Sequence, residues 1–215
     1  MTTNITAFYD YLLPGLKGLT PGTNALLALR EAAIELCERS RIWRYTPTAI
    51  DSVASQSTYP LTPPSGSEVS DVLWASYNSQ VPNLSPASHA DLDVLFPEGW
   101  RAEEGDVQYF YVTNDQELRL VKIPSEGVTG GIELEIALIP AFDATTLPDF
   151  LFANWRNEIA MGARAKLQMQ KAKPWSDSAG ARDAMRDFNA AIGEATYTAD
   201  RSNTTAPIRT RAQYS

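Results

Sequence analysis

The amino-acid sequence predicts an α+β protein in which N- and C-terminal helices form a helical bundle and a small antiparallel β domain is inserted between them. Three observations support this prediction: amphipathic helical segments near both ends, strand-like alternation in the middle, and a final stretch without apolar periodicity. We place the bundle in residues 1–45 and 146–198, the β-rich insertion in residues 46–145, and an extended C-terminal arm in residues 199–215.

The N-terminal part of the bundle is expected to contain two helical segments. Residues 6–13 form a short amphipathic segment that Pro14-Gly15 ends. A turn and N-cap signal in residues 21–24 then precede a longer helix over residues 25–41. Apolar side chains recur along this helix at the spacing of one face, so the helix should pack one side against the bundle: Leu26, Leu29, Ala33, Leu36 and Cys37.

Segments in the middle of the chain have the two-residue period of β-strands. Residues 72–77 place Val72 and Trp74 on one face and Leu73, Ala75 and Tyr77 on the other. Residues 107–113 and 118–123 predict a hairpin that turns at residues 114–116. The clearest alternation is in residues 132–138, where apolar side chains should point inward and two glutamates outward.

Proline-rich segments interrupt these strands. Residues 51–64 contain Tyr59-Pro60-Leu61 and two further prolines, which exclude a central strand because proline lacks a ladder donor. Residues 81–100 are rich in proline, serine and aspartate and predict a long exposed excursion. Such a long loop in a compact domain is usually functional or forms an interface.

The C-terminal part of the bundle is expected to be a helical hairpin. Pro148 suits the first turn of a helix, Lys173-Pro174-Trp175 ends that helix, and Ser176 or Asp177 can cap the next one. Small residues within 160–165 would let a neighbouring backbone approach closely. Each helix has one apolar or small face: Phe152, Trp155, Ile159, Gly162, Ala163 and Leu167 in the first, and Ala181, Met185, Phe188, Ala191, Ile192 and Ala195 in the second.

Composition limits the classes of function. The 215-residue chain is 44% hydrophobic and 20% charged, typical of a globular protein with a substantial core. Its net charge of −8 and pI of about 4.7 argue against nucleic-acid binding through a general basic face. We expect no membrane span and no signal peptide, since no apolar run is long enough and the N-terminus lacks a basic region followed by an apolar one. The single cysteine excludes an internal disulfide.

No group of residues has the pattern of a catalytic, cofactor-binding or metal-binding site, so we predict none of these. His89 lies in a Ser/Pro-rich loop and is expected to be solvated, and Cys37 on an apolar helix face should be an inert buried thiol. An acidic loop could attract a cation but lacks the spacing of a calcium loop. The acidic candidates are Glu103, Glu104 and Asp106 in that loop, and Glu133 and Glu135, which we interpret as a solvated strand face.

Three landmarks, in this order, resemble tailed-bacteriophage head-to-tail adaptor (neck connector) proteins. The first is the helix of residues 25–40 followed by Ile42-Trp43. The second is Tyr59-Pro60-Leu61 leading into β structure that includes Leu118-Arg119-Leu120 and ends at Ile139-Pro140. The third is the helix containing residues 159–167, then Lys173-Pro174-Trp175 and the last helix. The resemblance extends to about Ala199.

The resemblance implies a structural virion protein without enzymatic activity or cofactor. Such adaptors form a ring, typically a dodecamer, that docks under the portal protein, extends the DNA channel and presents an attachment surface for tail or nozzle proteins. DNA would pass through without sequence-specific binding, which suits an acidic chain that makes few phosphate contacts. The expected location is the virion neck, between capsid and tail, after assembly in the host cytoplasm.

The final residues have two interpretations. They could be a disordered terminus, or an arm that becomes ordered on a partner. The resemblance favours an arm that reaches the portal, with anchor residues of types enriched at interfaces: Pro207, Ile208, Arg209, Arg211 and Tyr214.

Two other functions remain alternatives to the adaptor. One is a soluble enzyme or small-ligand-binding domain with its site in the β insertion, and the other is a different phage neck or tail-completion protein. The residues favour assembly over catalysis, because no nucleophile, base and orienting group can be proposed together.

Overall fold

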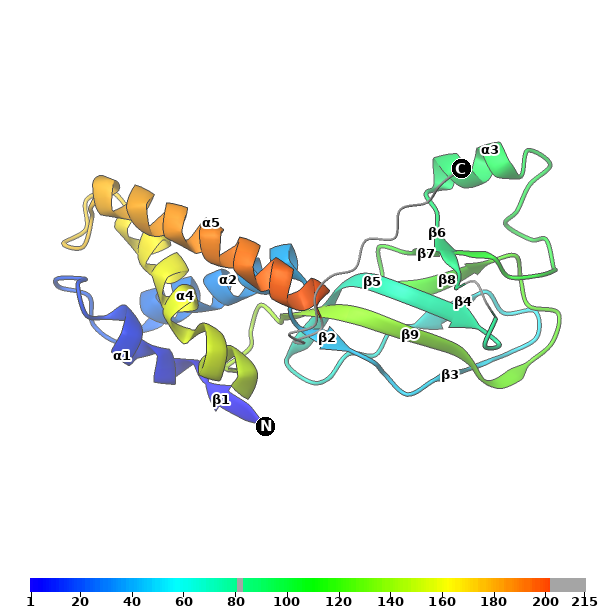
Figure 1. Ribbon diagram of the computed structural model, residues 1–215, viewed down its shortest axis with the longest axis horizontal. Helices are drawn as coiled ribbons and strands as arrows, with labels where there is room; N and C mark the ends of the chain where they lie inside the picture. The colour runs from blue at the N-terminus through cyan, green and yellow to red at the C-terminus, as the bar shows by residue number, and fades with distance from the viewer. Residues whose placement is uncertain (81–82, 202–215) are drawn as a thin grey trace. The chain divides into compact units, whose positions relative to one another are not determined.

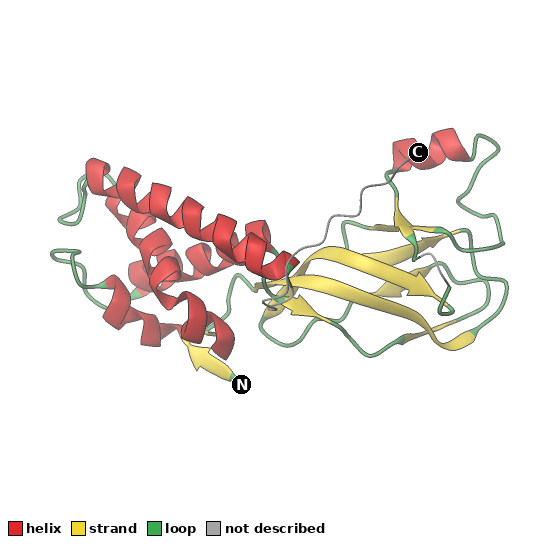
Figure 2. Ribbon diagram, in the orientation of Figure 1, coloured by secondary structure: helices red, strands yellow, loops and turns green. Residues whose placement is uncertain are grey.

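The computed structural model describes residues 1–80 and 83–201, which form a mixed α+β structure with five α-helices and three β-sheets (Figures 1 and 2). The predicted α+β class is confirmed. The chain divides into two compact units. We call Met1–Trp43 with the described residues from Ile139 onward the helical unit, and Arg44–Leu138 the β unit.

The helical unit combines both ends of the described chain. Its short strands β1 and β10 pair in antiparallel register, with Thr3 opposite Leu147. Edge-to-face stacking of Phe8 on Phe152, with ring centroids 5.1 Å apart, joins the N-terminal segment to the later helices. The elements are β1 (Thr2–Asn4), a 3₁₀ turn (Ile5–Phe8), α1 (Tyr9–Leu12), α2 (Thr23–Ser40), β10 (Thr146–Pro148), α4 (Asp149–Gln168) and α5 (Ser178–Asp200).

Helix α2 confirms the predicted N-terminal helix with small changes at its start. It begins at Thr23, and Gly22 occupies the N-cap position without a side-chain hydrogen bond. It ends at Ser40. The C-cap residue Arg41 has a left-handed backbone (φ 52°), and its N–H donates to the Cys37 carbonyl. The buried stripe contains mainly small residues, whereas Leu26 of the predicted stripe is only partly buried: Ala25, Ala28, Leu29, Ala32, Ala33, Leu36 and Cys37.

Helices α4 and α5 confirm the predicted hairpin, and Asp177 rather than Ser176 caps α5 by accepting from the N–H groups of Ala179 and Gly180. The expected start of α4 was wrong by one or two residues. Leu147 belongs to β10, and Pro148 is the N-cap rather than a first-turn residue. The reason is that this segment pairs with β1, which holds it extended.

The β unit contains two four-stranded sheets. Long strand β9 is central to the first, where it pairs with β2, β3 and β5. The second has the order β4-β8-β7-β6, and the predicted β7–β8 hairpin is confirmed. The strands are β2 (Arg44–Tyr45), β3 (Ile50–Ser52), β4 (Thr58–Pro60), β5 (Ser67–Tyr77), β6 (Ser85–Pro86), β7 (Tyr109–Val112), β8 (Glu117–Val121) and β9 (Val128–Pro140).

Burial along these strands follows the predicted patterns in part. In β9, Ile132, Leu134 and Ile136 are buried, and Glu133 is exposed, as the alternation predicted. Strand β4 lies at a sheet edge, as its proline, Pro60, required. Burial in β5 does not alternate, because residues 75–77 are all buried. The domain is also not purely antiparallel, since β6 and β7 pair in parallel.

The described part of residues 81–100 is mostly exposed, as predicted, but the expectation of a long loop without secondary structure was wrong. The segment contains β6 and a short helix, α3 (His89–Leu95), and it buries Leu92 and Trp100. Ser88 and Asp91 form a capping box that starts α3. The polar composition of this segment therefore gave no indication of a short helix whose buried Leu92 packs with Trp100.

Candidate interaction surfaces

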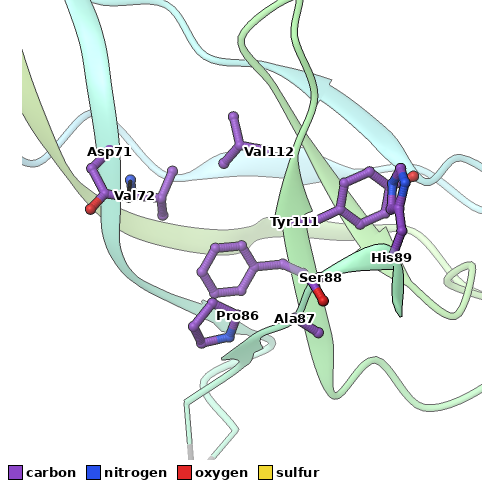
Figure 3. A pocket seen from close by; sticks show the side chains of 9 residues that line it. Asp71, Val72, Pro86, Ala87, Ser88, His89, Tyr111 and Val112 are labelled. Carbon is purple, nitrogen blue, oxygen red and sulfur yellow. Dashed lines mark hydrogen bonds between the residues drawn. The ribbon is translucent and has the colours of Figure 1, made fainter. Parts of the chain in front are cut away.

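An open pocket of about 520 Å³ in the β unit is a candidate site for catalysis or ligand binding (Figure 3). Strands β5 and β7 and the segment leading into α3 line it with mostly apolar side chains, and Asp71 and His89 lie on opposite sides. Its lining contains a serine next to a histidine. The Ser88 hydroxyl, however, donates to the Asp91 carboxylate at 2.6 Å and so serves the α3 cap rather than the His89 imidazole.

His89 begins α3 instead of lying in a loop, although its side chain is exposed as predicted. Its ring packs edge-to-face on Tyr111, with centroids 4.6 Å apart, and lies 5.7 Å from the Trp100 ring. The imidazole therefore extends an aromatic cluster. This arrangement supplies packing but no base directed at a nucleophile.

The aromatic cluster fixes α3 to the second sheet. Buried Trp100 donates its indole N–H to Asp93 at 2.9 Å, and the Arg101 guanidinium lies 4.4 Å from the Trp100 ring centroid. Arg101 also pairs with Asp93 at 3.3 Å. The Trp100 hydrogen bond and the Arg101 charge lower the pKa of Asp93, and hydrogen bonds from the Ser88 hydroxyl and N–H lower that of Asp91.

The acidic candidates from the sequence are dispersed in the β unit. Glu103 pairs with Lys122 at 3.0 Å, and Glu104 accepts from the Ser55 hydroxyl at 3.0 Å. Glu135 lies 4.0 Å from Arg44, a weak ion pair at the sheet surface. Among residues 1–80 and 83–201, no three His, Cys, Asp or Glu residues gather closely enough to hold a metal ion.

Cys37 is fully buried in α2, as predicted. Burial raises the pKa of its thiol, because the thiolate would have to exist in an apolar core. The buried thiol is therefore unreactive.

The helical unit contains features of close packing and charge pairing rather than a reactive group. A Cβ on Gly162 would lie 2.8 Å from the Phe188 ring, which confirms the predicted close approach of α4 and α5. Glu35 of α2 pairs with Lys166 of α4 at 2.8 Å and with Arg39 at 3.0 Å. Partial burial raises the pKa of Glu35, but the two cations outweigh it and the net shift is downward.

Helix α4 is kinked at Trp155, whose backbone is not helical (φ −129°, ψ 15°). Arg156 Nη1 donates to the carbonyl oxygens of Phe152 and Ala153 at 3.3 and 2.7 Å, which compensates carbonyls beside the kink. Its guanidinium also lies 5.3 Å from the Tyr11 ring centroid. Sequence reasoning missed this contact, since a helical periodicity contains no signal for one irregular residue.

The predicted portal-binding residues lie outside the described part of the chain, which ends at Arg201. They are Pro207, Ile208, Arg209, Arg211 and Tyr214. Their role stays a prediction.

Comparison with known proteins identifies the family of this chain. The sequence profile of the SU10 adaptor protein family matches residues 10–211, which include both units. The chain belongs to the SU10 adaptor protein family. No curated protein matches it significantly.

The SU10 adaptor family consists of phage structural adaptor proteins, which implies a structural rather than an enzymatic role and a virion component near the neck. The predicted resemblance to phage adaptor proteins is therefore confirmed at the level of the family. No helix in the described part of this family member is both long and apolar enough to cross a membrane.

Proposed function

We propose that this adaptor assembles with copies of itself into a ring, a dodecamer, that docks under the portal protein. The ring would extend the DNA channel and offer an attachment surface for tail or nozzle proteins. The observation that supports this most directly is the match to the SU10 adaptor family over residues 10–211. It covers nearly the whole chain, so a shared architecture rather than a shared motif supports the proposal.

In this proposal the two units have separate roles. The helical unit is the split bundle of the adaptor, and the β unit is a domain inserted between its halves. The buried residues of the main core come from residues 5–42 and 147–199, so the bundle has a core of its own. DNA would pass through the channel without sequence-specific contacts, which suits the net charge of −8.

Mass measurement of the full chain, with and without the portal protein, tests the proposal. We expect a defined ring-sized complex in the presence of the portal. A chain that stays monomeric with the portal, and instead binds a small molecule stoichiometrically, would support the ligand-binding alternative. A ring that binds a tail component but not the portal would indicate a different neck or tail-completion protein.

The proposed portal arm has its own test, in which residues 207–215 are deleted. We expect the truncated chain to keep its fold and lose affinity for the portal, since Arg209, Arg211 and Tyr214 are removed. Replacing only these three residues with alanine separates side-chain contacts from chain length. Unchanged portal binding by the truncated chain would reject the arm.

A further inference from the structure

Charge is distributed unequally between the two units. The β unit contains 14 of the 26 aspartates and glutamates but only four of the 18 lysines and arginines: Arg44, Arg101, Arg119 and Lys122. The remaining residues contain 12 acidic and 14 basic side chains. The net charge of −8 is therefore concentrated in the β unit, so charge disfavours contact between the β units of two copies and favours contact between unlike parts.

One end of the helical unit is basic and partly apolar. The loop after α1 and the loop between α4 and α5 meet there, because a Cβ on Gly18 would lie 2.9 Å from the Pro174 Cβ (Figure 1, left). We define the hairpin tip by five residues from these two loops: Lys17, Met169, Lys171, Lys173 and Trp175. All but the half-buried Trp175 are exposed, and Met169 is 62% exposed.

The positive charge of the hairpin tip is not neutralised within the described residues. Lys17, Lys171 and Lys173 take part in none of the ion pairs found there, and Lys173 lies 5.9 Å from the Trp175 ring centroid. The nearby Asp177 carboxylate accepts from the N–H groups of Ala179 and Gly180 and forms no ion pair with a lysine of the tip. The tip therefore combines three available cations with an exposed thioether and an indole, a composition suited to an acidic, apolar partner.

The β unit has a surface of the opposite kind on α3. Asp91, Val94 and Leu95 share one helix face through their i, i+3 and i+4 spacing, and Glu98 follows the helix. Val94 is 80% exposed and Leu95 is 50% exposed. The nearby cation, Arg101, is held by Asp93 and the Trp100 ring. We call Asp91, Val94, Leu95 and Glu98 the α3 surface.

We propose that the hairpin tip of one copy docks on the α3 surface of a second copy. Lysines would face carboxylates, and Met169 and Trp175 would cover Val94 and Leu95. The same contact would therefore pair opposite charges and bury apolar side chains. The two surfaces differ, which makes the contact heterologous, the kind that forms a ring when the rotation between successive copies closes. This inference rests on the proposed self-assembly. A nucleic-acid partner is less well matched, because three lysines neutralise few phosphates and the exposed apolar side chains would stay uncovered.

Reciprocal charge-reversal variants of the full chain test this contact. Lys171→Glu with Lys173→Glu makes the tip acidic. Ala90 is exposed in α3, four residues before Val94 and so on the same side of the helix. Ala90→Lys with Glu98→Lys therefore makes the α3 surface basic without altering Asp91 or Asp93. We expect each variant alone to need about tenfold higher concentration to assemble, because like charges now meet. An equimolar mixture should assemble like the unmodified chain, since each altered surface finds a complementary one. Mass photometry over a concentration and salt series provides the measurement.

Two further variants control for net charge. Arg186→Glu with Ala190→Glu adds similar negative charge elsewhere on the helical unit, and Thr129→Lys with Glu133→Lys adds positive charge elsewhere on the β unit. All four replaced side chains are exposed, and thermal melts verify the fold of every variant. We expect both controls to assemble like the unmodified chain.

Three results would overturn the contact: controls that weaken assembly equally, a mixture no better than its components, or an unmodified chain that stays monomeric at low salt and high concentration. The proposed function has a separate readout. If both docking variants still form rings on the portal, the contact is wrong and the adaptor function stands. If the unmodified chain never associates with the portal, the function fails instead.

Discussion

Gly162 shows how one residue sets the separation of two helices. Its missing side chain leaves room for the Phe188 ring, and a Cβ there would lie 2.8 Å from the ring carbons. We expect Gly162→Ala to lower the free energy of unfolding by about 1–3 kcal/mol through overpacking. Gly193→Ala is the matched control. It lies in α5 with open space around its Cβ position, so alanine should stabilise the helix by about 0.5–1 kcal/mol. Urea denaturation of both variants measures whether each substitution lowers or raises the free energy of unfolding. A destabilised Gly193→Ala or a neutral Gly162→Ala would contradict this account.

Glu35 provides a pH-dependent link between α2 and α4. Its pKa in the folded protein lies below the ordinary value of 4.5, because Lys166 and Arg39 outweigh partial burial. A lowered folded pKa stabilises the protein above the unfolded value, and this stabilisation is lost as the pH falls through the folded value. Since the pair is partly solvated, we expect Glu35→Gln to cost at most about 1 kcal/mol at pH 7.

The pH dependence separates this ion pair from a general effect of charge. The difference in unfolding free energy between Glu35→Gln and the unmodified protein should shrink as the pH falls below 4.5. Glu38→Gln, at an exposed position on the same helix, is the control and should cost less at pH 7. Denaturation curves at several pH values provide the comparison. A Glu35→Gln cost that stays constant into acid would rule out the ion pair as its source.

At the scale of elements, the start of α5 depends on one cap. Asp177 accepts from the N–H groups of Ala179 and Gly180 at 3.1 and 3.0 Å. Asp177→Ala should lower the free energy of unfolding by about 1 kcal/mol, and Asp177→Asn should recover most of it. Ser178→Ala, at the exposed first position of the helix, should have little effect. Guanidinium melts followed by circular dichroism measure these differences, and an Asp177→Ala variant as stable as Ser178→Ala would reject the cap.

Elements with a strong period were predictable, and elements held by tertiary contacts were not. The α2 stripe, the β7–β8 hairpin, β9 and the α4–α5 hairpin follow from side-chain spacing alone. Helix α3 did not, because a seven-residue helix has too few turns to show a period. Its anchor, Trp100, lies beyond its end and contacts it only in the folded protein. Composition showed that the chain is acidic, whereas the two surfaces of the proposed contact, the hairpin tip and α3, became visible only in the fold.

At the scale of the whole molecule, the helical unit should fold without the β unit. Its main core cluster draws no buried residue from residues 44–138 among those described. The chain also leaves and re-enters at neighbouring points, because Arg44 pairs with Ala137 across β2 and β9. A short Gly/Ser linker can therefore replace residues 44–138 without stretching the helical unit.

We expect this excised variant to remain monomeric, to have a strongly helical circular dichroism spectrum and to melt cooperatively. Loss of the β unit removes the α3 surface, so self-association through the hairpin tip should disappear while the fold remains. Adding back the isolated β unit in trans distinguishes the two effects, since binding should then require Lys171 and Lys173. A variant that shows no cooperative melt would mean that the core of the helical unit depends on the β unit for its stability.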